Sequence, residues 1–121
     1  MFYCRIVPRE QYSALLLFDS GATRSFVSLV LSNRFSGTPG ELDYPLEVDI
    51  TDDRSVRVAR VHRGCTLQLF SEQYPVDLVP IPLCGDKVIM GMDWLCPNGA
   101  VIDYEQQLVR FRTPCKGELV I

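Results

Sequence analysis

Several common kinds of functional site lack the residues that they need in this 121-residue chain. It contains one histidine, His62, and five cysteines, and no two cysteines lie within ten residues of each other. Zinc sites combine closely spaced cysteine and histidine ligands, so we expect no metal site and no cofactor. The odd number of cysteines and the lack of a signal peptide favour reduced thiols and a cytoplasmic location.

Blocks of like charge and long apolar runs are also missing. The net charge is −3 and no block of about five basic residues occurs, which argues against binding nucleic acid through its phosphates. No apolar run reaches the roughly 18 residues of a membrane-spanning helix, so we expect no membrane partner. Apolar residues make up 47% of the chain and charged residues 22%, as in an ordinary globular protein with a single domain, residues 1–121.

The sequence instead contains short apolar segments separated by turn residues. This pattern predicts an all-β domain with one or two short helices, whereas residues 1–12 are weakly patterned. Three prolines, Pro75, Pro80 and Pro82, indicate strand ends or sheet edges. Outside the hairpin described next, the expected strands span residues 13–18, 66–70, 76–81, 88–90, 101–103 and 108–111.

Two further patterns are more detailed. Apolar residues alternate with polar ones over 46–61, around turn residues at 51–55, which predicts a β-hairpin with a bulge or twist near its end at 59–61. The apolar residues of segment 26–35 fall at helical spacing and predict a short helix, which Thr23 or Ser25 would cap. Residues 92–95 predict one helical turn.

A carboxylate in an unusual place raises the question of function. Asp19 follows the apolar run Leu15–Phe18 and precedes Ser-Gly-Ala-Thr. An acid at the end of a buried strand costs free energy unless another group pairs with it or uses it. Asp19 could cap the helix that follows, because aspartate is a good N-cap residue. The alternative is catalysis.

Two stretches resemble the retropepsin family of aspartic proteases, and in particular the protease of gypsy-type LTR retrotransposons. They are DSGATRSFVS at 19–28 and VIMGMDWL at 88–95, and AVIDYEQQLVRF at 100–111 agrees with the same family. The resemblance covers roughly residues 13–113. It implies a retropepsin-like closed barrel with one lobe per chain and an active site that forms in the dimer.

The resemblance also implies a reaction. Aspartic proteases use two facing carboxylates that share a proton across one water molecule, one acting as base and the other as acid. Asp19 is the only aspartate of this chain that Ser-Gly or Thr-Gly follows, so the second carboxylate has to come from a second copy. The implied protein is a homodimeric endopeptidase that cuts a retrotransposon polyprotein beside apolar residues, in a cytoplasmic retroelement particle. The alternative is a module of the same fold that dimerises or binds peptides with little or no catalysis.

Other site residues take their expected roles from the same resemblance. Ser20, Gly21, Ala22 and Thr23 would support the catalytic loop, with Ser20 bonding across the dimer and Gly21 leaving room for substrate. Ile89 and Gly91 would pack the second motif against this loop. The turn of the hairpin would be the tip of a flap that touches substrate, although it lacks the glycines of retroviral flaps. Its residues are Thr51, Asp52, Asp53, Arg54 and Ser55.

Three other chemistries are weakly supported. His62 and Cys65 lie only three residues apart in a strand and turn region, a poor geometry for a cysteine-protease dyad. Ser20 lacks the G-x-S-x-G elbow of a serine hydrolase, and no G-K-[ST] follows Gly21 as a phosphate loop requires. We expect Asp93 to make structural hydrogen bonds and Trp94 to pack in the core or an interface.

Overall fold

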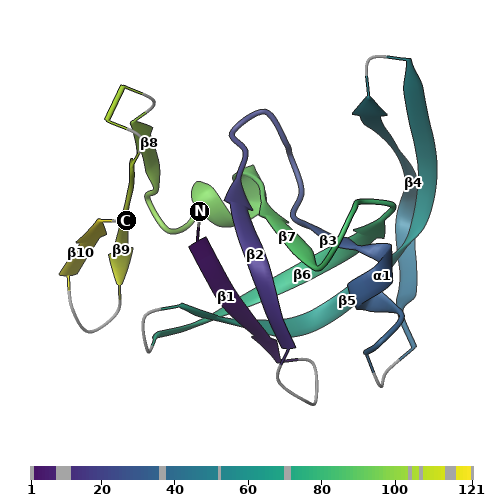
Figure 1. Cartoon of the computed structure of the whole chain (residues 1–121), viewed down its shortest axis with the longest axis horizontal. Helices are drawn as coiled ribbons and strands as arrows, with labels where there is room; N and C mark the ends of the chain where they lie inside the picture. Colours follow the sequence, from purple (N-terminus) through teal and green to yellow (C-terminus); the bar gives the residue numbers. More distant parts are fainter. Residues whose placement is uncertain are drawn as a thin grey trace.

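The computed structural model describes residues 2–7, 12–35, 38–51, 53–69, 72–103, 105–106, 108–113 and 117–120. Strands dominate this part of the chain, and its two helices are one turn each (Figure 1). The predicted all-β class is therefore confirmed. The strands are β1 (Phe2–Val7), β2 (Tyr12–Phe18), β3 (Phe26–Ser28), β4 (Gly40–Thr51), β5 (Arg54–Leu69), β6 (Glu72–Ile81), β7 (Lys87–Met90), β8 (Val101–Asp103), β9 (Leu108–Thr113) and β10 (Gly117–Val120), and the helices are α1 (Leu29–Ser32) and α2 (Met92–Leu95).

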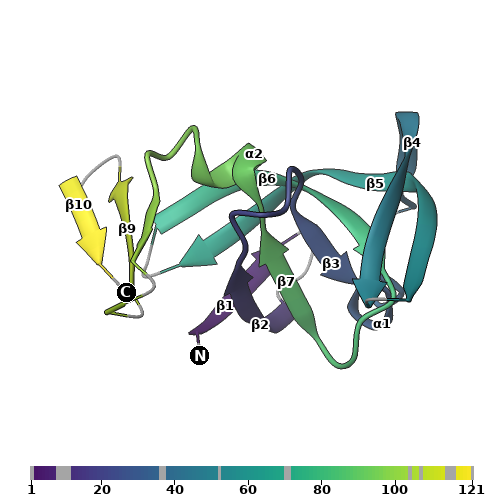
Figure 2. The same cartoon turned by 90° about the horizontal axis from the view of Figure 1, so that it is seen from above.

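Seven strands form one sheet in the order β1-β2-β7-β3-β6-β5-β4. Because β1 also pairs with β5, six of these strands are linked in a ring, and β4 stays outside it as the last strand of the sheet. The sheet as a whole does not close into the expected barrel, because β4 remains outside this ring. Strands β8, β9 and β10 form a separate antiparallel sheet, which lies at the opposite end of the molecule from the β4–β5 hairpin (Figures 1 and 2).

The predicted hairpin is present and is longer than expected. Strands β4 and β5 pair from Gly40 opposite Val61 to Thr51 opposite Arg54, which leaves a two-residue turn at its tip. Beyond this hairpin, β5 continues through 62–69 as a partner of β6. The expected irregularity near 59–61 is present, because the pairing shifts register between Glu41 opposite Arg60 and Leu46 opposite Val58. A further register shift of β5, against β6, lies between His62 and Cys65.

The apolar core has two parts. The larger cluster fills the ring and includes Leu16, Leu67, Val88 and Trp94, as expected for the tryptophan. The smaller cluster lies beneath the root of the hairpin, and its buried members are Phe26, Leu42, Val61, Val79 and Ile81. Since burial of a large apolar side chain stabilises a fold by about 1.5–3 kcal/mol, both clusters contribute substantially to stability.

The helix predicted over 26–35 is largely wrong. Phe26–Ser28 form strand β3, which pairs in parallel with β6 and antiparallel with β7, and only Leu29–Ser32 are helical. Three consecutive buried residues suit a strand covered on both faces, and such a short run has no resolvable period. The predicted cap is also wrong, because the N-cap residue is Ser28 and its side chain makes no capping bond.

The N-terminal segment needs a correction, whereas the prolines lie at strand ends or edges, as expected. The weakly patterned N-terminal segment contains β1, which pairs with β2 and β5. Pro75 and Pro80 lie inside β6, whereas Pro82 follows its end. Strand β6 pairs with β5 over 72–78 and with β3 over 79–81, so each proline lies where β6 has one paired neighbour. The amide hydrogen that proline lacks is not needed on the other side.

Candidate active site

Asp19 stands at the point where β2 leaves the sheet. Its backbone N–H donates to the carbonyl oxygen of Met90 at 3.0 Å, which continues the parallel pairing of β2 with β7. The chain then turns sharply, and the N–H of Ala22 donates to the carbonyl oxygen of Asp19 at 3.2 Å. The strand expected to be buried before Asp19 is only partly so, because Ala14 and Leu16 are buried whereas Leu17 is exposed. Asp19 is itself exposed, at the surface of a cavity.

Gly21 holds that carboxylate in place. Its N–H donates to Oδ1 of Asp19 at 2.8 Å, and a Cβ at this position would lie 3.1 Å from the same oxygen. Such a contact is tighter than an ordinary van der Waals approach. Glycine therefore lets the backbone approach and orient Asp19 without crowding it. The hydrogen bond serves the carboxylate rather than a helix end, which argues against the capping role.

The second motif packs against the loop that follows β2 (residues 19–25). The N–H of Met92 donates to the carbonyl oxygen of Ala22 at 2.8 Å. A Cβ on Gly91 would lie 2.2 Å from the carbonyl oxygen of Arg24 and 2.7 Å from that of Ala22. These atoms belong to the backbone and cannot rotate away, so only glycine fits here. Gly91 therefore lies directly against the backbone of this loop.

Ser25 is the residue in this loop whose role the sequence did not reveal. Its side chain is fully buried, and its hydroxyl donates to Oδ1 of Asp93 at 2.6 Å. Its backbone N–H donates to Oδ2 of the same carboxylate at 3.2 Å, and its Oγ accepts the N–H of Gly91 at 3.1 Å. Asp93 is therefore a structural hydrogen bonder, as expected. The local signal at Ser25 suggested a helix cap, and nothing nearby pointed to a partner 68 residues away.

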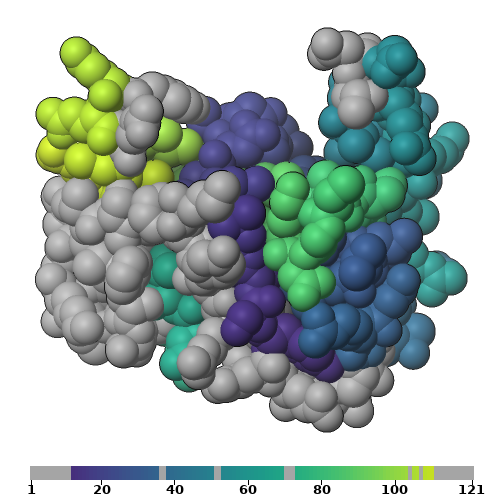
Figure 3. All heavy atoms as spheres, in the orientation of Figure 1, coloured from purple at the N-terminus to yellow at the C-terminus, as the bar shows by residue number. Residues whose placement is uncertain are grey.

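A cavity of about 420 Å³ lies between this loop and the β4–β5 hairpin. Figure 3 shows the notch between the loop that follows β2 and the hairpin. One wall is the loop that follows β2, a second is strand β4, and the remaining wall is apolar. The lining residues are Asp19, Gly21, Ala22 and Thr23 from the loop, Glu47, Val48, Asp49 and Ile50 from β4, and Phe26, Ile81, Leu83 and Ile89 from the apolar wall.

Three of the five residues predicted at the flap tip are absent from the described lining of the cavity. Asp53, Arg54 and Ser55 are exposed and lie outside the lining, which comes from the preceding residues of β4. Asp52 lies outside the described residues, and Thr51 is described only by its backbone pairing with Arg54. Ser20 is exposed beside Asp19 and is not part of the cavity wall.

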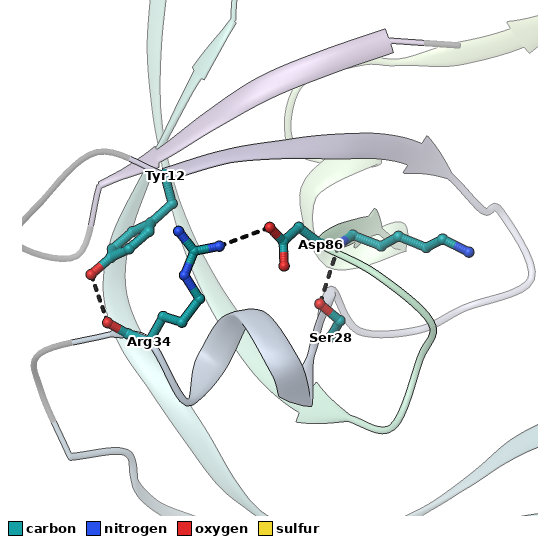
Figure 4. Close-up of polar contacts among 5 residues, drawn as sticks. Tyr12, Ser28, Arg34 and Asp86 are labelled. Carbon is teal, nitrogen blue, oxygen red and sulfur yellow. Dashed lines mark hydrogen bonds and ion pairs between the residues drawn. The ribbon is translucent and has the colours of Figure 1, made fainter.

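Polar contacts of Arg34 and Ser28 hold the loop between β6 and β7, which includes Leu83, against the rest of the fold (Figure 4). The guanidinium of Arg34 donates to Asp86 at 2.8 Å and lies over the ring of Tyr12, whose hydroxyl donates to the carbonyl oxygen of Arg34 at 2.6 Å. The backbone N–H of Lys87 donates to the hydroxyl of Ser28 at 3.2 Å. The ion pair is partly exposed and contributes little by itself, but together these contacts tie α1 to the start of β2 and β7.

The structure offers no cysteine-protease dyad at His62 and Cys65. The Sγ of Cys65 donates to the backbone oxygen of His62 at 3.7 Å, while the imidazole Nε2 bonds to the hydroxyl of Ser32 at 2.6 Å. Burial, reinforced by the negative charge of Asp77, raises the pKa of the Cys65 thiol to about 11, which disfavours a thiolate. Burial also lowers the pKa of His62, so its role is that of a neutral core residue.

Two absences concern the described residues alone. No three His, Cys, Asp or Glu side chains among them converge in a way that could hold a metal ion. No helix in the same part of the chain is long and apolar enough to cross a membrane.

Comparison with known proteins gives two findings. The profile of a family described as retroviral aspartyl protease matches residues 6–116. Among solved structures, the chain is similar to the retroviral protease-like domain of Ddi1 from Leishmania major, with a TM-score of 0.57 and 16% sequence identity over 100% of this chain and 94% of that one. At this identity the likeness shows the fold, which is retropepsin-like. No match was found among curated protein sequences.

Proposed function

Since the chain belongs to the retroviral aspartyl protease family, we propose that it is an aspartic endopeptidase that acts as a homodimer. One observation carries the proposal. The exposed carboxylate of Asp19 is oriented by the N–H of Gly21 on the wall of a cavity large enough to admit part of a peptide. No other aspartate of the chain precedes a Ser-Gly or Thr-Gly pair, so one chain supplies half of a catalytic dyad.

The proposed dimer places the Asp19 of each subunit beside the twofold axis. Two carboxylates so close cannot both ionise easily and share one proton, as is established for aspartic proteases as a class. The ionised member takes a proton from a water molecule as that water attacks the scissile carbonyl carbon. The protonated member donates a hydrogen bond to the carbonyl oxygen. The carboxyl group that took the proton of the water then passes it to the leaving nitrogen, and the tetrahedral intermediate collapses to a carboxylic acid and an amine.

Strand β4 supplies the binding surface in this proposal. It is the last strand of its sheet, and among the described strands it pairs with β5 alone, so no described strand pairs with its other edge. Residues 47–50 of β4 line the cavity. An extended peptide that adds to such an edge gains main-chain hydrogen bonds whatever its sequence.

The proposed substrate is a polyprotein of a gypsy-type retrotransposon, processed in a cytoplasmic particle. The apolar wall formed by Phe26, Ile81, Leu83 and Ile89 supports cleavage beside apolar side chains. The retrotransposon assignment rests on the DSGATRSFVS and VIMGMDWL stretches.

A second candidate is a dimerisation or peptide-binding module without useful catalysis. The observation that favours it is the turn of the hairpin, where residues 51–55 contain no glycine. A hairpin tip without glycine has less backbone freedom to close over a substrate and reopen.

The test is cleavage of a capsid-type polyprotein fragment by the purified chain and by Asp19→Asn, at a pH of about 5 to 6. Asp43→Asn is the matched control, because Asp43 is an exposed aspartate of β4 outside the cavity lining. We expect Asp19→Asn to lose about 10³-fold or more in rate and the control to lose nothing. The rate should also rise faster than linearly with protein concentration and should fall with pepstatin.

Cleavage that persists in Asp19→Asn would overturn the proposed mechanism. A folded, dimeric wild-type chain that binds peptides and never cuts them would establish the second candidate instead.

A further inference from the structure

The cavity-facing strand β4 has an alternating pattern of side chains. Val48 and Ile50 are half-buried, and Val48 packs against the apolar cluster beneath the hairpin. Glu47 and Asp49 alternate with them and are exposed. Because successive side chains of a strand point to opposite faces, one face of β4 is apolar here and the other is acidic.

All charged residues in the described lining of the cavity are acidic. Three of the lining residues carry a carboxylate, namely Asp19, Glu47 and Asp49, and no lysine or arginine is among the described lining residues. A low-dielectric cleft lined by charges of one sign attracts ligands of the opposite charge. In the proposed dimer both copies contribute, so the shared cleft is more negative than one cavity alone.

The two acidic residues of β4 differ in whether a basic residue lies opposite them on β5. Glu47 is in register with Arg57 on β5, whereas Asp49 is in register with the neutral Ser55. Within the described part of the chain, neither carboxylate makes a hydrogen bond or an ion pair. The negative charge of Asp49 is therefore less neutralised by the hairpin than that of Glu47. Asp49 lies on the strand whose edge a peptide would join.

We propose that Asp49, assisted by Glu47, selects peptides with a lysine or arginine in the strand that adds to β4. The inference rests on the proposed function, since it assigns a specificity to the same cleft. Side chains directly opposite each other on neighbouring strands have Cβ atoms about 4.5–5.5 Å apart, and opposite charges there attract. The substrate class is then an extended segment in which basic residues face Glu47 and Asp49 and apolar residues face Val48 and Ile50.

The first measurement is the binding of labelled peptides to Asp19→Asn, in which cleavage does not interfere. The peptides share an apolar segment through which a single lysine, or a single glutamate, is moved one position at a time. We expect lysine to bind about five- to tenfold more tightly than glutamate at positions two residues apart, and the difference to shrink at high salt. A flat profile would overturn the inference.

Variants of β4 assign the effect to its residues. In the same background, Asp49→Asn should remove the preference, Asp49→Lys should reverse it, and Glu47→Gln should weaken it. Asp43→Asn, on the same strand outside the cavity lining, should leave it unchanged. The melting temperature of each variant shows whether it is folded, and a preference that survives Asp49→Lys in a folded protein contradicts the proposal.

The wild-type chain separates the two proposals. If it cleaves peptides with equal kcat/KM for the lysine and glutamate series, the proposed specificity is wrong and the proposed protease activity is supported. If Asp19→Asn binds with the lysine preference and the wild type cuts nothing, the specificity stands and the proposed catalysis fails. If no peptide is bound or cut, both are wrong.

Discussion

The side chain of Asp93 accepts two hydrogen bonds from Ser25, one from its hydroxyl at 2.6 Å and one from its backbone N–H at 3.2 Å. The pair joins the end of the catalytic loop to the first turn of α2. Ser25 is fully buried, so its hydroxyl depends on protein partners rather than on solvent. The geometry of the loop around Asp19 is therefore set partly by a carboxylate that has no place in the proposed chemistry.

Removing Asp93 should destabilise the domain. Asp93→Ala takes away the acceptor of a buried hydroxyl, and we expect the free energy of unfolding to fall by about 1–3 kcal/mol. Urea denaturation measures this loss, with Asp43→Ala as the control at an exposed aspartate. In a double-mutant cycle, Ser25→Ala and Asp93→Ala should be non-additive, and additive losses would show that the two residues act separately.

Gly91→Ala should be far more damaging than alanine at an ordinary glycine. The new Cβ would lie 2.2 Å from the carbonyl oxygen of Arg24, so the backbone of the catalytic loop has to shift. We expect a loss of more than about 2 kcal/mol in the free energy of unfolding. Gly40→Ala is the matched control, because its Cβ would meet nothing closer than 3.8 Å, and a change within about 0.5 kcal/mol is expected. Equal effects at the two sites would contradict the packing described here.

Acidification should destabilise the fold through His62. Burial lowers its pKa below the ordinary value of 6.5, so the unfolded chain binds a proton more readily than the folded one. The stability that neutral His62 contributes is complete above that value and is lost as the pH falls towards the folded pKa. Between about pH 7 and pH 5, the wild type should lose more free energy of unfolding than His62→Gln, as measured by denaturation at each pH. If the free energy of unfolding fell equally with pH in the wild type and in His62→Gln, His62 would not be a source of the acid sensitivity.

Local patterns in the sequence predicted the hairpin, the end of β2 and the short strand before Gly91. Each is a contiguous segment whose side chains alternate or end at a turn residue. The resemblance then assigned Asp19 and Gly91 to one loop region, and the structure brings them together through the parallel pairing of β2 with β7.

Other features depend on contacts that no local pattern records. Strand β1 exists because β2 and β5 flank it, and β3 is a strand because β6 and β7 bury three consecutive residues. The apolar residues over 26–35 fall at helical spacing, although Phe26–Ser28 form a strand and only Leu29–Ser32 are helical. The predicted flap tip was taken from its turn residues, but the residues that line the cavity are set by how the whole hairpin lies over the ring.

Strand β5 is shared by the hairpin and the ring. Among the described strands, its residues 54–61 pair with β4 alone, while residues 62–69 pair with β6 and partly with β1. Backbone amides exchange with solvent through local openings whose free energy depends on how firmly each segment is held. One continuous strand should therefore show two levels of protection from hydrogen exchange, low in the hairpin and high in the ring. The hairpin can therefore open and re-form above the cavity many times while the paired strands that position Asp19 stay intact.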